Sequence, residues 1–229
     1  RERERQRQRD RETERAGGQD LKLLDVADVA DHLGLNQMGL TLVARKRFLR
    51  LLRGGSAKQQ QGAAPELPAG KAHHAFLSHT WLPDEAGRDT HARAGRLNRL
   101  LQARGLVTWF DADKMQGCID DEMCRGIDSS AVFVVLVTQK YMAKVGGADL
   151  ADNCKKEFNY ASRRLTAARM LPVVMERCML KTDGWEGPLG MHLGACLYCP
   201  LLADPDADEA TFAAEADGVC AGIVRMLQH

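Results

Sequence analysis

The carboxylate of Glu157 lies in a periodic segment, at the border of its apolar face. Apolar residues of this segment recur every three or four positions, as in an amphipathic helix: Leu150, Cys154, Phe158, Ala161 and Leu165. Glu157 is one residue, or about 100°, from Phe158, which places it at the edge of that stripe. No basic residue stands three or four positions before or after it. Such a carboxylate is a candidate site residue, although most helix glutamates are simply solvated.

Metal and nucleotide motifs are weak in this sequence. Of seven cysteines, only Cys196 and Cys199 have a CxxC spacing. A zinc site would need a second pair or nearby histidines, so we expect no metal. Free thiols in a reducing cytosol are the better interpretation. The sequence contains neither GxGxxG nor a Gly-Lys-Ser/Thr phosphate loop, so dinucleotide binding of the usual Rossmann kind is not supported.

Strand and helix signals alternate from residue 72 to the C-terminus. Short apolar runs predict five strands, at residues 75–77, 107–110, 131–137, 170–175 and 195–199. Periodic segments predict helices at residues 92–103, 119–127, 150–165 and 211–227. The run AVFVVLV at 131–137 is typical of a central strand buried on both faces. This alternation indicates an α/β fold with a parallel sheet covered by helices on both faces.

The ends of the first two strands are the expected ligand site. In an open parallel sheet, ligands bind beyond the carboxyl ends of the strands, where the strand order reverses. This rule selects Ser78, His79 and Trp81 after the first strand, and Asp111 after the second. Phe76 and Trp81 are expected to offer ring surface. For His79 the alternative is a loop histidine whose hydrogen bonds are satisfied within the protein.

Three segments precede the α/β region. Residues 1–19 open with RERERQRQRDRETER, which has no apolar side chain, so we expect a solvated helix or a disordered segment. Residues 20–53 carry two short apolar stripes on either side of Gly34, which indicates a helical hairpin. Residues 54–71 are rich in Gly, Ala, Gln and Pro and predict a flexible linker. Because the chain begins at Arg1 rather than Met, we expect a fragment or a processed form.

Four ordered blocks carry a family resemblance. They are AFLSH at 75–79, GLVTWFD at 105–111 followed by Gly117, GIDSS at 126–130 leading into AVFVVLV, and NCKKEF at 153–158. Through them, residues 72–229 resemble a Toll/interleukin-1 receptor (TIR) domain. The resemblance implies a flavodoxin-like five-stranded parallel sheet of order 2-1-3-4-5. A receiver module is disfavoured, since it needs an acidic cluster at the end of the first strand, where Ser78-His79 stand.

A second, partial resemblance covers residues 20–53. Leu33-Gly34-Leu35, Gly39 and RKRFL at 45–49 are similar to the C-terminal half of a sterile alpha motif (SAM) domain. A plain helical hairpin is the alternative.

The TIR resemblance implies a reaction at Glu157. Many TIR domains cleave NAD⁺ between nicotinamide and ribose, and Glu157 falls on the family's catalytic Glu. NAD⁺ would then be the substrate, and no separate cofactor is expected. The residues expected to bind it are Phe76, Ser78, His79, Trp81, Asp111 and Asn153. One carboxylate suffices because nicotinamide leaves as a neutral pyridine, whereas ordinary glycosidases need a second carboxylic acid.

A non-catalytic adaptor is the alternative to this enzyme. Asn153 stands where many TIR domains have Trp, four residues before the Glu. Met115-Gln116 stand where a basic pair is common in the family, late in the loop after the second strand. Glu157 favours the enzyme and Asn153 favours the adaptor. In either case the resemblance implies that the loop after the second strand makes TIR–TIR contacts, through Asp113, Lys114, Met115 and Gly117. We therefore expect self-association through TIR and SAM-like surfaces, and binding to other TIR-domain proteins.

Composition argues against other partners. The net charge of +1 gives no reason to expect nucleic acid or an anionic membrane. The longest apolar run, Val132 to Val137, is too short for a membrane span. No charged-then-apolar N-terminal pattern predicts a secretory signal. We expect a cytoplasmic signalling protein.

Overall fold

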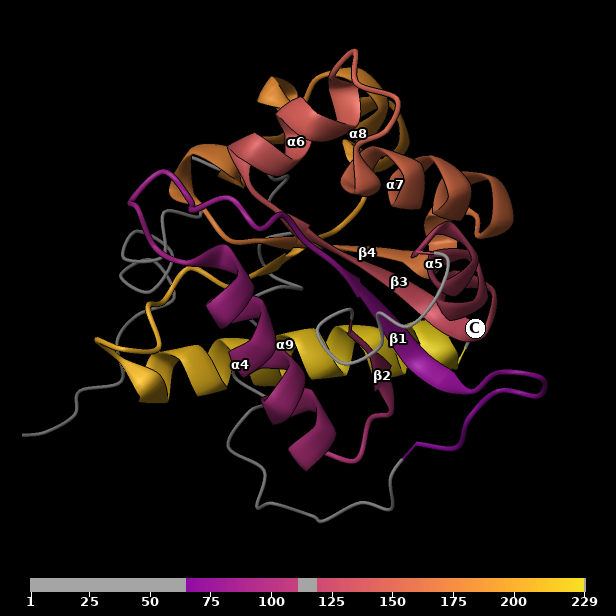
Figure 1. Ribbon diagram of the computed structural model, residues 1–229. Helices are drawn as coiled ribbons and strands as arrows, with labels where there is room; N and C mark the ends of the chain where they lie inside the picture. The colour runs from indigo at the N-terminus through magenta and orange to yellow at the C-terminus, as the bar shows by residue number, and fades with distance from the viewer. Residues whose placement is uncertain (1–64, 111–118, 229) are drawn as a thin grey trace, which may run out of the picture. The chain divides into compact units, whose positions relative to one another are not determined.

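In the residues that this computed structural model describes, 65–110 and 119–228, five parallel strands form one sheet. Their spatial order is β2 (Thr108–Trp109), β1 (His73–Ser78), β3 (Ser130–Val137), β4 (Met170–Val174) and β5 (Cys199–Pro200). Every neighbouring pair runs parallel. The predicted α/β fold with strand order 2-1-3-4-5 is confirmed (Figure 1).

The centre of the sheet is β3, and all eight of its residues are buried. It pairs with β1 on one side and β4 on the other, with Phe133 opposite both Phe76 and Met170. Because both neighbours are strands and both faces are covered, apolar residues can fill seven consecutive positions of β3, from 131 to 137. The predicted buried central strand is confirmed.

Helices cover both faces of the sheet (Figure 1). On one face lie α4 (Thr90–Ala103) and α9 (Glu209–Leu227), which pack against Leu77 and Val134. The other face is covered by α5 (Ile119–Asp128), α6 (Gln139–Gly146), α7 (Asn153–Arg164) and α8 (Gly187–Leu193), around Phe76 and Phe133. Successive strand residues point to opposite faces, so each strand contributes to both cores. Three short 3₁₀ helices lie in the connections: η4 (Ala167–Arg169) between α7 and β4, and η5 (Arg177–Leu180) and η6 (Thr182–Gly184) between β4 and α8.

Several predicted boundaries are wrong. Helix α7 begins at Asn153, because the Asp152 side chain accepts a hydrogen bond from the backbone N–H of Lys155 and caps the helix. Leu150 therefore lies outside the helix and is 77% exposed, so it is not part of the apolar stripe. The edge strands β2 and β5 are two residues each, shorter than predicted. Helices α6 and α8 were not predicted, because each is short and has few apolar repeats.

Some predictions fall outside the described residues. These are the charged segment 1–19, the SAM-like segment 20–53, most of the linker, Asp111, and the loop residues Asp113, Lys114, Met115 and Gly117. Their structures and roles stay predictions. Among the helices that are described, none is long and apolar enough to cross a membrane.

Candidate functional site

Ser78, Tyr141 and Glu157 meet through hydrogen bonds at the carboxyl edge of the sheet. The Ser78 hydroxyl donates to Glu157 Oε2 over 2.6 Å, and its oxygen lies 2.8 Å from the Tyr141 hydroxyl. Ser78 and Tyr141 are fully buried, and Glu157 is only 6% exposed. The interpretation of Glu157 as a solvated helix glutamate is therefore wrong.

The local sequence places each of these side chains. Ser78 is the last residue of β1, in register with Val135 of the buried β3. Tyr141 lies in the first turn of α6, where its backbone N–H donates to the side chain of the capping Thr138 over 3.0 Å. Glu157 is in the second turn of α7, beside Phe158, whose ring is fully buried. Residues from three separate elements thus converge on one carboxylate.

The direction of the hydrogen bonds follows from protonation. Burial raises the pKa of Tyr141 well above its usual value, with smaller contributions from Cys154 and Glu157, so the phenol keeps its proton. A serine hydroxyl has one hydrogen, and Ser78 donates it to Glu157. Tyr141 must then be the donor in its bond with Ser78. The Tyr141 hydroxyl thus donates to Ser78, and the Ser78 hydroxyl donates to the carboxylate.

Cys154, one turn before Glu157, is not a nucleophile candidate. Burial, and next the charge of Glu157, raises the pKa of its thiol to about 12. Its sulfur donates to the backbone oxygen of His79 over 3.4 Å. Since a thiol is reactive only as the thiolate, Cys154 is inert at neutral pH.

A stack of aromatic rings begins at His79, the residue after Ser78. His79 Nε2 lies 2.7 Å from His91 Nδ1, and the two ring centroids are 5.0 Å apart. Trp81 stacks on the outer side of His91 at 3.8 Å, and Phe110 lies 5.1 Å from His79. Burial, and next the nearby His91, lowers the pKa of His79 to about 4. His79 is therefore a neutral, buried imidazole whose hydrogen bond is satisfied within the protein, as one of the two alternatives anticipated.

The structure sorts the remaining predicted site residues. Trp81 is 58% exposed and offers ring surface, as expected. Phe76 does not, because it is fully buried between Trp109 and Phe133, with ring centroids at 4.2 and 5.2 Å. Asn153 is exposed in the first turn of α7, one turn before Glu157.

Two residues of this site were not found by sequence analysis. Tyr141 lies on α6, a helix of eight residues of which only Tyr141 and Val145 are buried, so periodicity gave little signal. His91 is in the first turn of α4, and nothing local in the sequence connects it with His79. Both residues join the site through hydrogen bonds to residues of the first strand's end, Tyr141 to Ser78 and His91 to His79.

The loops that carry these side chains are anchored by buried charges. Glu176, which is 2% exposed, accepts hydrogen bonds from the backbone N–H groups of Glu85 at 2.8 Å and Gln139 at 2.7 Å. Asp84 pairs with the buried Arg93 at 2.8 Å, and that guanidinium also donates to a carbonyl just beyond β5. The loops after β1 and β3 are thereby tied to the ends of β4 and β5.

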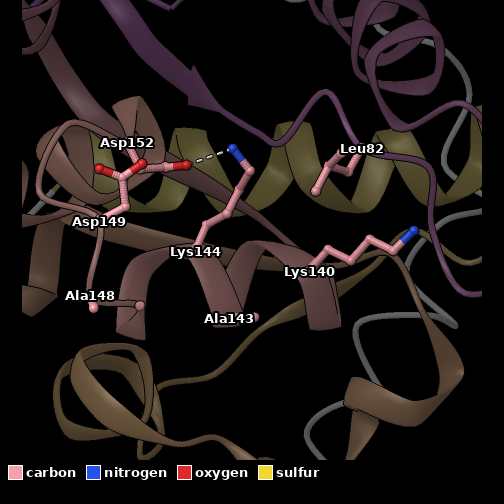
Figure 2. Close-up of a pocket in the computed structure, with 8 residues that line it drawn as sticks. Leu82, Lys140, Ala143, Lys144, Ala148, Asp149 and Asp152 are labelled. Atoms are coloured by element: carbon pink, nitrogen blue, oxygen red, sulfur yellow. Dashed lines mark hydrogen bonds and ion pairs between the residues drawn. The ribbon is translucent and has the colours of Figure 1, made fainter.

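A shallow groove of about 300 Å³ lies between the loop after β1 and helix α6. Figure 2 shows Leu82 facing Lys140 and Lys144 across it, with Lys144 paired to Asp152. The lysine nitrogen and the carboxylate oxygen are 2.6 Å apart. Since Leu82 follows Trp81 and Asp152 precedes Asn153, the groove adjoins the carboxylate site but does not include Glu157.

The fold and the site define a flavodoxin-like α/β domain with a buried carboxylate beyond the strand ends. Residues 76–214, more than half of the chain, match the TIR domain family. The chain belongs to that family. A comparison with curated proteins finds no match.

A solved structure shows the same fold. A metazoan TIR-STING receptor from C. gigas, in complex with 2',3'-cGAMP, aligns with a TM-score of 0.50 and 16% identity. The alignment covers 71% of this chain and 42% of that receptor, so the chain spans less than half of its length. A second structure of a TIR-STING receptor from C. gigas aligns at 0.46 and 19% identity, over 70% of this chain and 43% of the receptor. At 16% identity, the likeness to the first receptor structure establishes the fold alone.

Proposed function

We propose that this TIR domain cleaves NAD⁺ between nicotinamide and ribose, with Glu157 as the catalytic carboxylate. The bond from ribose C1′ to the pyridine nitrogen breaks, and its electron pair leaves on neutral nicotinamide. Water then adds to C1′ and loses a proton, which gives ADP-ribose. Because the leaving group is neutral, no general acid is needed, and one carboxylate can stabilise the positive charge that develops on the ribose.

The observation that carries this proposal is the environment of Glu157. The carboxylate is almost fully buried beyond the ends of the strands and accepts a hydrogen bond from Ser78. A negative charge in a site of low dielectric interacts more strongly with a developing cation than one in water. Open α/β sheets bind their ligands at this edge.

Neighbouring side chains supply the chemistry for holding the substrate. The exposed ring of Trp81 suits a flat base, and its rigid stacking on His91 limits the entropy lost on binding. The Asn153 amide, one turn from Glu157, offers both a donor and an acceptor to the ribose hydroxyls. Asp111, which follows the second strand in the sequence, stays an expected substrate-binding residue.

The test is nicotinamide release by the purified chain, wild type against Glu157→Gln. Glutamine has nearly the same shape and can still accept from Ser78, so the fold should persist while cleavage falls about a hundredfold or more. Glu186→Gln, at an exposed position just before α8, is the matched control and should keep full activity. Full activity in Glu157→Gln would remove this residue from the mechanism.

A non-catalytic adaptor is the second candidate, in which the domain acts only through TIR–TIR contacts within the cell. Trp81 and Leu82 are exposed large apolar residues at the rim of the groove, as an interaction surface requires. Asn153 in place of Trp also favours this role. Concentration-dependent assembly by light scattering, with no nicotinamide release at any concentration, would establish the adaptor and exclude the enzyme.

A further inference from the structure

The hydrogen bonds around Glu157 form a directed series across three elements. Tyr141 on α6 donates to Ser78 at the end of β1, and Ser78 donates to Glu157 on α7. Ser78 is 63 positions from Tyr141 and 79 positions from Glu157 in the sequence, and its buried hydroxyl connects the two. In a series of this kind each donor polarises the next, which strengthens the final bond to the carboxylate.

Glu157 needs such support because of its proposed role. A carboxylate that must face a developing cation has to be held in one orientation before the reaction begins. The terminal torsion of a glutamate is broad and two-fold, so the backbone of α7 alone does not fix the carboxylate plane. A short bond from Ser78 to Oε2 fixes it, and the Tyr141 bond fixes the Ser78 hydroxyl in turn.

We infer that Tyr141 and Ser78 are positioning residues that orient the Glu157 carboxylate for NAD⁺ cleavage. The inference rests on the proposed function and assigns Ser78 a role other than substrate binding. With an exposure of 1%, Ser78 has almost no surface for a substrate. Cys154, one turn before Glu157 on the same helix, donates to the His79 carbonyl and so does not substitute for Ser78.

The competing account is purely structural: two buried hydroxyls satisfy each other's hydrogen bonds and only stabilise the fold. The two accounts differ in kinetics. If the series only stabilises the fold, then removing a hydroxyl lowers the melting temperature and leaves the turnover of the folded protein unchanged. If it orients the carboxylate, then kcat falls while substrate binding is retained.

The experiment measures kcat and KM for nicotinamide release by the full chain, at one fixed high protein concentration. We expect Ser78→Ala to lower kcat about tenfold to a hundredfold, as loss of a hydrogen bond to a charged group implies, and to change KM by less than about threefold. Ser78→Thr, which restores the donor, should recover most of the lost turnover. Tyr141→Phe keeps the buried ring and removes only the hydroxyl, so a smaller loss of about threefold to tenfold is expected.

Ser162→Ala is the matched control, because Ser162 lies on the same helix and its hydroxyl, within the described part of the chain, bonds only to the Asn159 carbonyl. It should leave kcat unchanged. If wild type cleaves NAD⁺ and both Ser78→Ala and Tyr141→Phe, folded, retain wild-type kcat, the positioning role is overturned while the proposed function stands. If folded wild type releases no nicotinamide, the proposed function fails and the positioning role fails with it. If wild type cleaves NAD⁺ and Glu157→Gln is fully active, Glu157 leaves the mechanism and the positioning role is overturned, while NAD⁺ cleavage itself stands.

Discussion

His79 and His91 share a short nitrogen–nitrogen contact beneath the ring of Trp81, and the environment of His79 favours its neutral form. Burial first, and the neighbouring His91 second, lowers the pKa of His79 from 6.5 to about 4. Between those two values the unfolded chain binds more protons at this position than the folded one. The contribution of His79 to the free energy of unfolding is therefore expected to decrease as pH falls from about 6.5 to about 4, by on the order of 3 kcal/mol.

We expect a variant without this imidazole to lose that acid sensitivity. His79→Asn should melt at a lower temperature than wild type at pH 7.5, since stacking is lost, but its melting temperature should decline less between pH 6.5 and 4.5. Thermal melts of both proteins across this range are the measurement. Parallel declines in the two proteins would show that His79 does not carry the acid-sensitive step.

At the scale of single elements, the sheet depends most on β3, and Val134 at its middle is fully buried. Val134→Asp would place a carboxylate in the core without a partner, which costs several kcal/mol. We expect this variant to be unfolded or insoluble by circular dichroism and sedimentation. Val107→Asp, the same change at a position 45% exposed beside β2, should fold normally. A soluble, cooperatively melting Val134→Asp protein would contradict the placement of this strand.

The loops at the carboxyl edge depend on Glu176, whose two oxygens accept from the backbones of Glu85 and Gln139. In Glu176→Gln one oxygen becomes an amide nitrogen, so one of the two N–H groups loses its acceptor. We expect a loss of about 1–3 kcal/mol in the free energy of unfolding. Amide hydrogen exchange should also become faster at Glu85 or Gln139, relative to wild type. Unchanged exchange at both amides would mean that other contacts hold these loops.

For the molecule as a whole, the predicted N-terminal segments bear on how the TIR domain is used. A tethered SAM-like module raises the local concentration of its attached domain to the order of millimolar. The linker of residues 54–71, if flexible, averages roughly 25 Å end to end, which lets neighbouring TIR domains meet.

We therefore expect NAD⁺ cleavage per molecule to rise with protein concentration. Removal of residues 1–53 should lower it at any fixed concentration, whereas removal of residues 1–19 alone should have little effect, since that segment has no apolar residues before Ala16. Specific activity that is flat across dilution, and equal in all three chains, would exclude activation by assembly without affecting the assignment of Glu157.

Sequence alone was sufficient where the signal is local. The run AVFVVLV is long and apolar enough to predict a strand buried on both faces. Five short apolar runs that alternate with helices predict a parallel sheet. The edge of an apolar stripe made Glu157 a candidate, which the TIR resemblance then selected, and the end of the first strand pointed to Ser78. The lengths of β2 and β5, by contrast, were not predictable, since an edge strand extends only as far as its single neighbour pairs with it.

The tertiary structure decided everything that depends on a partner distant in sequence. Periodicity gives the side of a helix on which Glu157 lies, but the burial of that side depends on how α7 packs on the sheet. Phe76 could not be assigned to core or site from its strand, because two neighbouring rings brought by β2 and β3 enclose it. Tyr141 and His91 carry no local signal, since each acquires its role from a hydrogen bond that exists only once the chain has folded.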